Sequence, residues 1–341
     1  MDYQKRSLRL GAAAIICALL LRLASTGFFR PVAEFFGKPN IAAFLIYLET
    51  GRKVRFSPSS EVYEVFAHES AAPDFARETE TATQPTEIAL PSFAPQDAET
   101  IKLKNNSGRK IDATALITRP LQWNLKDSNP AVLILHTHAT ESYTRTAGED
   151  YKETSAFRTL DEEHNMLSVG DRLTELLEAG GITVIHDRSI HDYPSYNGSY
   201  NSARKEITAR LKEHPSVCLV LDLHRDASGD LKNQMRTKAV VDGKSSAQIM
   251  FVVGTGSAVL QSPHWEDNFS LALKLQVQME NLAPGICRNI NLRAQRFNQD
   301  LTAGMLLVEV GAAGNTREEA LTAVEVLAQA ILDLAEGTED T

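Results

Sequence analysis

The sequence has few cysteines, no excess of positive charge and only one long apolar run. Three cysteines among 341 residues cannot form a disulfide framework, and Cys17, Cys218 and Cys287 all lie in apolar segments, so we interpret them as unpaired packing residues. Lysine and arginine number 35 against 44 aspartate and glutamate residues, which gives a net charge of −9. A nucleic-acid partner is not expected, because such proteins normally carry a basic surface.

The one long apolar run lies at the amino terminus. It follows Lys5, Arg6 and Arg9 and continues to about Phe29. Its length is near that of a membrane-spanning helix, and cationic residues before such a helix favour a cytoplasmic amino terminus. We therefore predict that residues 1–30 are a cytoplasmic stub and an uncleaved membrane anchor, and that the rest of the chain lies outside the cell membrane.

The composition then divides the chain into three further parts. Residues 31–67 form a juxtamembrane segment whose short apolar stretch, 41–48, cannot span a membrane. Residues 68–105 are rich in Pro, Thr, Ala and Glu, which predicts a disordered linker. Residues 106–341 are predicted to be an extracytoplasmic catalytic domain.

Strand-like and helix-like segments alternate in the folded part. Apolar runs predict strands at 131–135, 182–185, 217–223 and 305–310, and another near 286. Helical spacing follows a capping-box pattern at 159–162 and recurs at 201–212, 266–282 and from 315 onward. Asp242-Gly243 predicts a hairpin turn between strands at 237–241 and 248–253. The fold class is α/β, with a mainly parallel or mixed sheet flanked by helices.

Histidines and carboxylates stand where three of the apolar runs stop. They are His136, His138 and Glu141 after the first run, His224 at the end of another, and Glu309 in the last. In an open α/β sheet, ligands bind beyond the carboxyl ends of the strands, so these side chains are expected in one crevice. Imidazoles and a carboxylate suit Zn²⁺, and a further carboxylate can activate a metal-bound water. The pattern predicts a zinc hydrolase.

The first histidine pair leaves the ligand set open. His136 and His138 are two apart and would share one face of an extended strand. His138 and Glu141 have a His-x-x-Glu spacing, with which one turn can offer nitrogen and oxygen to the same ion. His138 and Glu141 are the preferred ligands. The alternatives are that either histidine only orients another ligand, or that Asp161 is the acidic ligand.

The two later strands supply one ligand and one proton carrier. His224 shares a strand face with Asp222, and either Asp222 or Asp226 can accept the second N–H of its imidazole. Glu309 lies between two valines, where a buried carboxylate needs a polar crevice or a cation. A raised pKa would let Glu309 carry a proton from zinc-bound water to a leaving amine.

Four segments together resemble the stage II sporulation protein P family. They are His-Thr-His-Ala-Thr-Glu-Ser-Tyr, Asp-Glu-Glu-His-Asn-Met-Leu-Ser-Val-Gly, Leu-Asp-Leu-His-Arg-Asp-Ala and Val-Glu-Val-Gly-Ala-Ala-Gly-Asn-Thr. The wider similarity is to zinc-dependent N-acetylmuramoyl-L-alanine amidases, and it implies that His224 is a ligand and Glu309 the catalytic glutamate. The chain has His-Thr-His where those amidases have a Gly-His-Gly-Gly turn, so the choice between His136 and His138 stays open.

The resemblance also implies a substrate, a place and partners. It implies a membrane-anchored peptidoglycan hydrolase that cuts the amide between the muramic acid lactyl group and L-alanine, with some action on stem-peptide cross-links. The place is the septal or engulfing membrane of the mother cell, and the partners are stage II sporulation proteins D and M. Two other functions remain: a zinc carboxypeptidase-like exopeptidase, which needs an arginine clamp such as Arg225, Arg293 or Arg296, and a catalytically silent wall-binding module.

Overall fold

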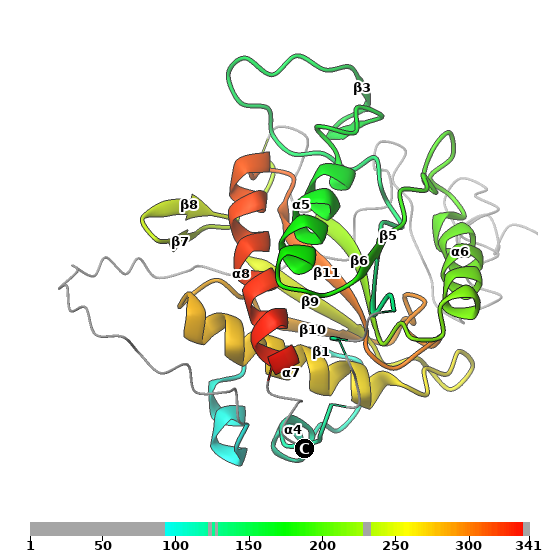
Figure 1. The fold of residues 1–341 in the computed structure, drawn as a ribbon, viewed down its shortest axis with the longest axis vertical. Helices are drawn as coiled ribbons and strands as arrows, with labels where there is room; N and C mark the ends of the chain where they lie inside the picture. The colour runs from blue at the N-terminus through cyan, green and yellow to red at the C-terminus, as the bar shows by residue number, and fades with distance from the viewer. Residues whose placement is uncertain (1–92, 122–124, 127–128, 228–232, 337–341) are drawn as a thin grey trace, which may run out of the picture. The chain divides into compact units, whose positions relative to one another are not determined.

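The computed structural model describes residues 93–121, 125–126, 129–227 and 233–336, which form an α/β unit built on one large sheet (Figure 1). The seven strands lie in the order β1-β10-β9-β11-β6-β2-β5. In chain order they are β1 (Leu103–Asn106), β2 (Val132–Leu135), β5 (Val184–His186), β6 (Leu219–Asp226), β9 (Ile249–Gly254), β10 (Ile290–Arg293) and β11 (Met305–Ala312). Two small hairpins lie outside this sheet: β3 (Glu153–Ser155) with β4 (Arg158–Thr159), and β7 (Ala239–Val241) with β8 (Lys244–Ser246).

The sheet contains two sets of parallel strands that run in opposite directions. All neighbouring strands pair in parallel except β9 and β11, which pair antiparallel. The carboxyl ends of β2, β5, β6 and β11 therefore lie at one end of the sheet, which we call the site end. The carboxyl ends of β1, β9 and β10 lie at the opposite end, which we call the far end.

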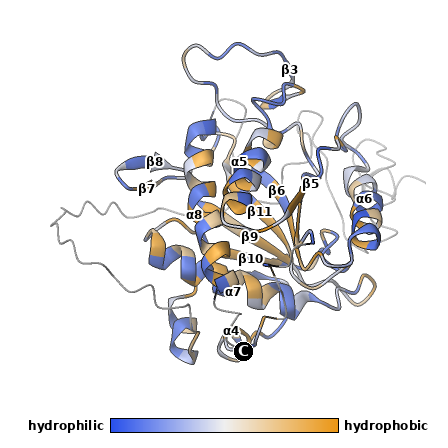
Figure 2. Ribbon diagram, viewed as in Figure 1, coloured by the Kyte–Doolittle hydropathy of each residue, from blue (hydrophilic) through white to orange (hydrophobic). Residues whose placement is uncertain are grey.

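Helices cover both faces of the sheet, as α/β alternation predicts. The helices are α4 (Ala113–Ile117), α5 (Met166–Ala179), α6 (Ser199–Glu213), α7 (Trp265–Leu282) and α8 (Arg317–Glu336), with a 3₁₀ helix η1 at Pro95–Thr100. Val132 and Ile134 of β2 pack in the cluster that includes α5, α7 and α8, whereas Leu133 and Leu135 pack with residues of α6. Alternate residues of this strand thus serve opposite faces, and both faces are apolar (Figure 2).

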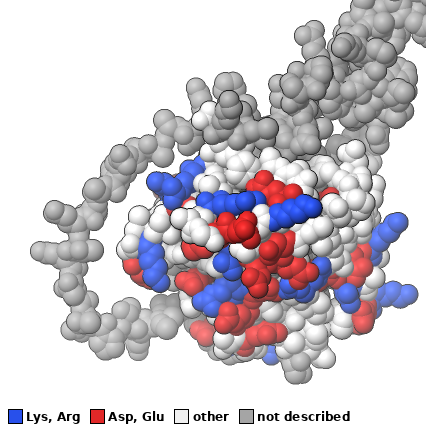
Figure 3. All heavy atoms as spheres, turned by 90° about the horizontal axis from the view of Figure 1, so that it is seen from above, with Lys and Arg blue, Asp and Glu red and all other residues white. Residues whose placement is uncertain are grey.

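Charged side chains of both signs are mixed on the surface. On the face seen in Figure 3, lysines and arginines lie among aspartates and glutamates. Many of these charges form ion pairs; for example, Arg172 of α5 lies 2.8 Å from Glu325 of α8. Exposed pairs of this kind contribute about 0–1 kcal/mol each, so the apolar core remains the main source of stability.

Two element boundaries differ from the sequence prediction. The helix predicted from 159 begins at Met166, because the side chain of Asn165 caps it by accepting from the Leu167 N–H. The turn predicted at Asp242-Gly243 is present, with positive φ at both residues, but its second strand is β8. Residues 249–254 instead form β9 inside the large sheet, where every residue is buried.

The folded part also begins earlier than predicted. The disordered linker was expected to reach residue 105, but η1 and β1 lie before that boundary, and β1 pairs with β10. Phe93, Ile101 and Leu103 pack against the main core, which explains the order of this segment. The predicted anchor lies outside the described residues, and within them no helix has the length and apolarity needed to cross a membrane.

Candidate functional site

The turn after β2 is tied to the neighbouring strand β6. Thr137 donates to both carboxylate oxygens of Asp222, through its N–H (2.7 Å) and its hydroxyl (2.6 Å). Leu135, the last residue of β2, stands opposite Asp222 in the ladder. The Glu141 N–H donates to the His138 carbonyl at 3.1 Å and closes the turn. These bonds place the side chains of His138 and Glu141 at the site end of the sheet, beside β6.

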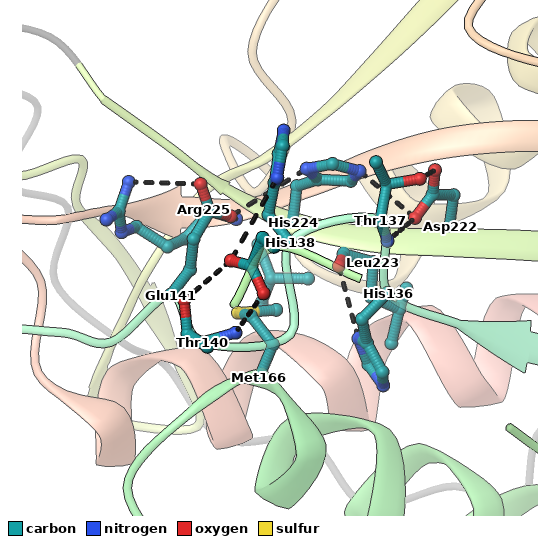
Figure 4. A network of polar contacts seen from close by, with 12 residues as sticks. His136, Thr137, His138, Thr140, Glu141, Met166, Asp222, Leu223, His224 and Arg225 are labelled. Atoms are coloured by element: carbon teal, nitrogen blue, oxygen red, sulfur yellow. Dashed lines mark hydrogen bonds and ion pairs between the residues drawn. The ribbon is translucent and has the colours of Figure 1, made fainter. Parts of the chain in front are cut away.

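Four of the five predicted site residues come together there. The rings of His138 and His224 lie 5.2 Å apart and nearly perpendicular. Glu141 Oε2 lies 3.7 Å from His224 Nδ1, and Glu309 stands opposite His224 in the β11–β6 ladder. All four side chains are buried, and Figure 4 shows His138, Glu141 and His224 turned toward one another. The expectation that ends of separate strands converge is met for these residues.

His136 points away from this group (Figure 4). Its Nδ1 lies 3.2 Å from the Leu223 carbonyl and its Nε2 lies 2.9 Å from Nε2 of His186. The prediction that His136 and His138 share a face is wrong, because β2 ends at Leu135 and the chain turns immediately afterwards. Gly170 of α5 leaves room for the histidine pair, since a Cβ there would overlap Nε2 of both rings.

The other acidic candidates have different roles. Asp161 lies 3.0 Å from His164 and accepts the Glu163 N–H, so its contacts are local to the loop before α5. Asp226 pairs with Arg288 at 2.8 Å. Of the two proposed partners of His224, it is Asp222 that makes the contact, with Oδ1 3.0 Å from Nε2. Asp222 therefore fixes the turn that carries His138 through hydrogen bonds and contacts the ring of His224 as an ion pair.

Two arginines beside Glu141 keep its carboxylate ionised. Glu141 accepts from the Arg225 backbone N–H and from the Arg158 side chain, both at 3.2 Å. Burial alone would raise the pKa of Glu141, but the guanidinium groups of Arg225 and Arg158 outweigh it and lower the pKa to about 2. By contrast, burial lowers the pKa of His138 to about 3, so its imidazole is neutral.

The surroundings favour the charged form of His224 and the neutral form of Glu309. Burial disfavours the charged imidazole, but nearby carboxylates, first that of Asp222, raise the pKa of His224 to about 9. Burial, followed by the charge of Asp226, raises the pKa of Glu309 to about 8. Glu309 Oε2 is buried without a hydrogen-bond partner among the described residues. A carboxyl group in this setting exchanges a proton near neutral pH.

The sequence analysis missed the aromatic and ionic cover of the site. The Tyr196 ring stacks on His138 with 4.4 Å between centroids, and Tyr200 of α6 meets the same imidazole edge to face at 5.6 Å. Asp192 holds the surrounding loop, accepting from Thr140 Oγ1 at 2.6 Å and Arg158 Nη1 at 2.7 Å. The loop follows β5, whose carboxyl end also lies at the site end, so the rule used for the other strands would have pointed to it.

His138 and Glu141 fit a zinc site in kind, but the side chains of the site do not fit one in placement. His138 is neutral and its Nδ1 is buried without a hydrogen-bond partner among the described residues, as a free metal donor would be. Glu141 is anionic and lies near His224. However, within the described part of the chain no three His, Cys, Asp or Glu side chains are arranged so that they could hold a metal ion.

Comparison with known proteins gives a family match over most of the chain. The model of the family "Stage II sporulation protein P" matches residues 50–332. A curated relative, stage II sporulation protein P of Bacillus subtilis (strain 168), is 27% identical over 267 residues. The match covers 75% of this chain and 63% of that relative, so the chain spans less than two thirds of the relative's length.

Solved amidase structures show a more distant likeness. The CwlD amidase from Clostridioides difficile, in complex with the GerS lipoprotein, is 15% identical, with a TM-score of 0.36 and coverage of 60% of this chain and 96% of that one. The N-acetylmuramoyl-L-alanine amidase AmiC2 of Nostoc punctiforme is 13% identical, with a TM-score of 0.33 and coverage of 61% and 94%. Identity and TM-score are both low, so these comparisons assign no functional residue.

Proposed function

The chain belongs to the stage II sporulation protein P family, and from that membership we propose that it is a peptidoglycan hydrolase of sporulation. The bond cut is the amide between the muramic acid lactyl group and L-alanine. The observation that carries the proposal is Glu309, a buried carboxyl group with a raised pKa and a free oxygen beside His224. A structural carboxylate in a strand of valines would be paired instead.

Each residue of the site has a role in this reaction. Our proposal assigns Zn²⁺ to His138 and His224, with Glu141 as the acidic ligand, although the three side chains do not form a metal site as they are placed in the structure. The bound ion would polarise the scissile carbonyl and lower the pKa of a water molecule. Glu309 takes the proton from the attacking water and gives it to the leaving amine. Asp222 orients the His224 ring, and the burial of the site strengthens every electrostatic interaction within it.

Two of the three arginines that could act as the carboxylate clamp of an exopeptidase are engaged elsewhere. A carboxypeptidase needs a cationic group free to bind the terminal carboxylate of its substrate. Arg225 is buried and donates to Glu141 and to the carbonyls of Ser142 and Phe157, and Arg296 pairs with Asp300. These two arginines are therefore engaged, which favours an amidase.

We also propose a cellular location and partners, which depend on residues outside the described part of the chain. The cationic residues before the amino-terminal apolar run support a single-pass anchor with the catalytic domain outside the membrane. The family resemblance supports stage II sporulation proteins D and M as partners. Protease added to intact protoplasts is expected to remove the carboxy-terminal domain, while a cytoplasmic control protein survives.

Product analysis tests the proposed bond. Purified peptidoglycan is digested with the full chain, and the soluble products are identified by mass spectrometry. Free stem peptides that begin with L-alanine, together with glycan strands stripped of peptide, are the expected products. Products cut only within the cross-links would show that the enzyme is an endopeptidase and not an amidase. An unchanged polymer would support a wall-binding module without catalytic activity.

A further inference from the structure

A hollow lies at the far end of the sheet, away from the catalytic residues. Its volume is about 320 Å³, and its lining includes Arg109, Ser257, Gln261, Ser262 and Trp265. Arg109 follows β1, whereas the other four residues follow β9. Carboxyl ends of parallel strands are where ligands bind in open α/β sheets, and this sheet has a second set of them.

Arg109 leaves part of its hydrogen-bonding capacity unused. Its Nη2 donates to the Thr255 carbonyl at 2.8 Å, and its guanidinium lies 5.1 Å from the centre of the Trp265 ring. Among the described residues Arg109 forms no ion pair, whereas the nearby Arg119 pairs with Glu266 and Asp267. Arg109 is exposed, and its guanidinium, held by the Thr255 carbonyl and without a carboxylate partner, can bind a carboxylate of a ligand.

Ser262 provides an independent sign of a ligand. The residue is only 3% exposed, it lines the hollow, and its hydroxyl has no hydrogen-bond partner among the described residues. A buried hydroxyl without a partner costs stability, so its presence calls for a further partner. The hollow also lies at the amino end of α7, which begins at Trp265, and helix amino ends attract anions.

Part of the lining of the hollow is apolar. Ala258 and Pro263 belong to this lining. Together with the Trp265 ring they offer contacts for small aliphatic groups next to the anion-binding side chains. The combination matches a short peptide that carries a free carboxylate and methyl side chains.

We propose that Arg109, Ser262 and Trp265 form a second binding site, which takes a carboxylate of a peptidoglycan stem peptide. This inference rests on the proposed function for the choice of ligand. The site holds a stem peptide at the far end of the sheet while another is cut at the site end. The enzyme thereby stays on the polymer between cuts.

Trp265 allows binding at this hollow to be measured apart from the catalytic site. The chain has two tryptophans, Trp123 and Trp265, so Trp265 is the only tryptophan in a Trp123→Phe variant of the full chain, purified in detergent. The probe is a synthetic stem tetrapeptide, which contains no muramoyl amide to cut. A saturable change in Trp265 fluorescence is expected with the free peptide, and none with the same peptide amidated at all its carboxyl groups.

Matched variants complete the test. Arg109→Ala is expected to weaken binding about tenfold or more, because it removes a charge-assisted bond. Lys110→Ala removes the same charge from the neighbouring exposed residue and should leave the dissociation constant unchanged. Ser262→Ala should weaken binding while raising the melting temperature, since it removes the unpartnered hydroxyl.

Equal affinity of wild type and Arg109→Ala, or equal affinity for the amidated peptide, would overturn the second site. Release of stem peptides from purified peptidoglycan is measured in parallel and reports on the proposed function alone. Loss of that release with retained tetrapeptide binding would therefore count against the hydrolase and not against the hollow.

Discussion

The phenol ring of Tyr196 lies flat on the imidazole of His138, with 4.4 Å between ring centroids and 11° between ring planes. Tyr196 is 50% exposed, whereas His138 is 5% exposed. Arg158 also lies over the Tyr196 ring, 4.8 Å from its centre. Tyr196 therefore covers one face of the neutral imidazole of His138 and lies between that face and bulk solvent.

Removal of the Tyr196 ring should expose His138. In metal-free Tyr196→Ala, carbethoxylation of His138 by diethylpyrocarbonate is expected to be several-fold faster than in metal-free wild type, because the reagent attacks neutral, accessible imidazoles. Peptide mass spectrometry gives the rate at His138. Tyr196→Phe keeps the ring and is the matched control, so it should react at the wild-type rate. An unchanged rate in Tyr196→Ala would show that another group covers His138.

Zinc binding should depend on His138 and His224 but not on His136. The wild-type chain is expected to bind about one Zn²⁺, as sites with three protein ligands and a water do. His138→Ala and His224→Ala should lose the metal, whereas His136→Ala should retain it, because both nitrogens of His136 have other partners. Elemental analysis of each purified variant, with circular dichroism as a check on folding, gives the answer. Equal zinc content in wild type and a His138→Ala, His224→Ala double variant would contradict the metal site.

Glu309→Gln should separate folding from catalysis. The amide is nearly the same size as the carboxylate but cannot accept a proton from water. General acid–base catalysis contributes about 10²–10⁴-fold, so release of stem peptides is expected to fall by at least about two orders of magnitude. The zinc content should not change. A variant that cuts at the wild-type rate would make Glu309 structural, and one that loses zinc would make it a ligand.

Glu319 should make the stability of the fold sensitive to acid. This buried carboxylate at the start of α8 accepts hydrogen bonds from Arg236, Ser245, Asn315 and the Thr316 N–H. Burial opposes ionisation, but these bonds, first that of Arg236, lower the pKa of Glu319 to about 2. Because the pKa is lower in the folded chain, its stabilisation is complete above about pH 4.3, the ordinary glutamate value, and is lost as pH falls toward 2.

Urea unfolding at pH 7 and pH 3 measures this contribution. Glu319→Gln is expected to lower the free energy of unfolding at pH 7 by about 1.5–3 kcal/mol, the range for hydrogen bonds to a charged group. The variant should lose less stability than wild type between the two pH values. Glu318→Gln, which changes an exposed neighbour, is the control. Parallel losses in Glu319→Gln and wild type would show that other carboxylates govern the acid response.

The sequence predicted the strands of the site because their signal is local. The apolar runs before His136, around His224 and around Glu309 are buried strands in the structure, as their composition indicates. The prediction that His136 and His138 share a face failed because it depends on a contact that is not local in sequence. The turn after Leu135 is set by the bonds of Thr137 to Asp222, which stands more than 80 residues later in the chain. The hydrophobic pattern of the sequence near His136 does not indicate that contact.

The start of α5 and the placement of β9 show two further limits of prediction from local sequence. Thr159 fits a capping box, but its hydroxyl accepts the Asp161 N–H within a turn, and Asn165 caps the helix. The run at 248–253 is predicted to belong to a hairpin because a strand after a turn usually returns along its neighbour. However, the observed strand is buried on both faces and therefore lies inside the large sheet. That burial depends on helices that are distant in sequence.

Strand β1 also determines where the catalytic part of the chain can be cut. It forms the outer edge of the sheet, with three exposed polar residues, Lys104, Asn105 and Asn106, and covers the backbone of β10. Truncation at residue 106, the boundary that composition suggests, would remove this cover. The buried strand β10 would then present unpaired N–H and C=O groups to other molecules and promote edge-to-edge aggregation. A well-behaved fragment should therefore begin before Phe93, ahead of the first residues that pack on the core.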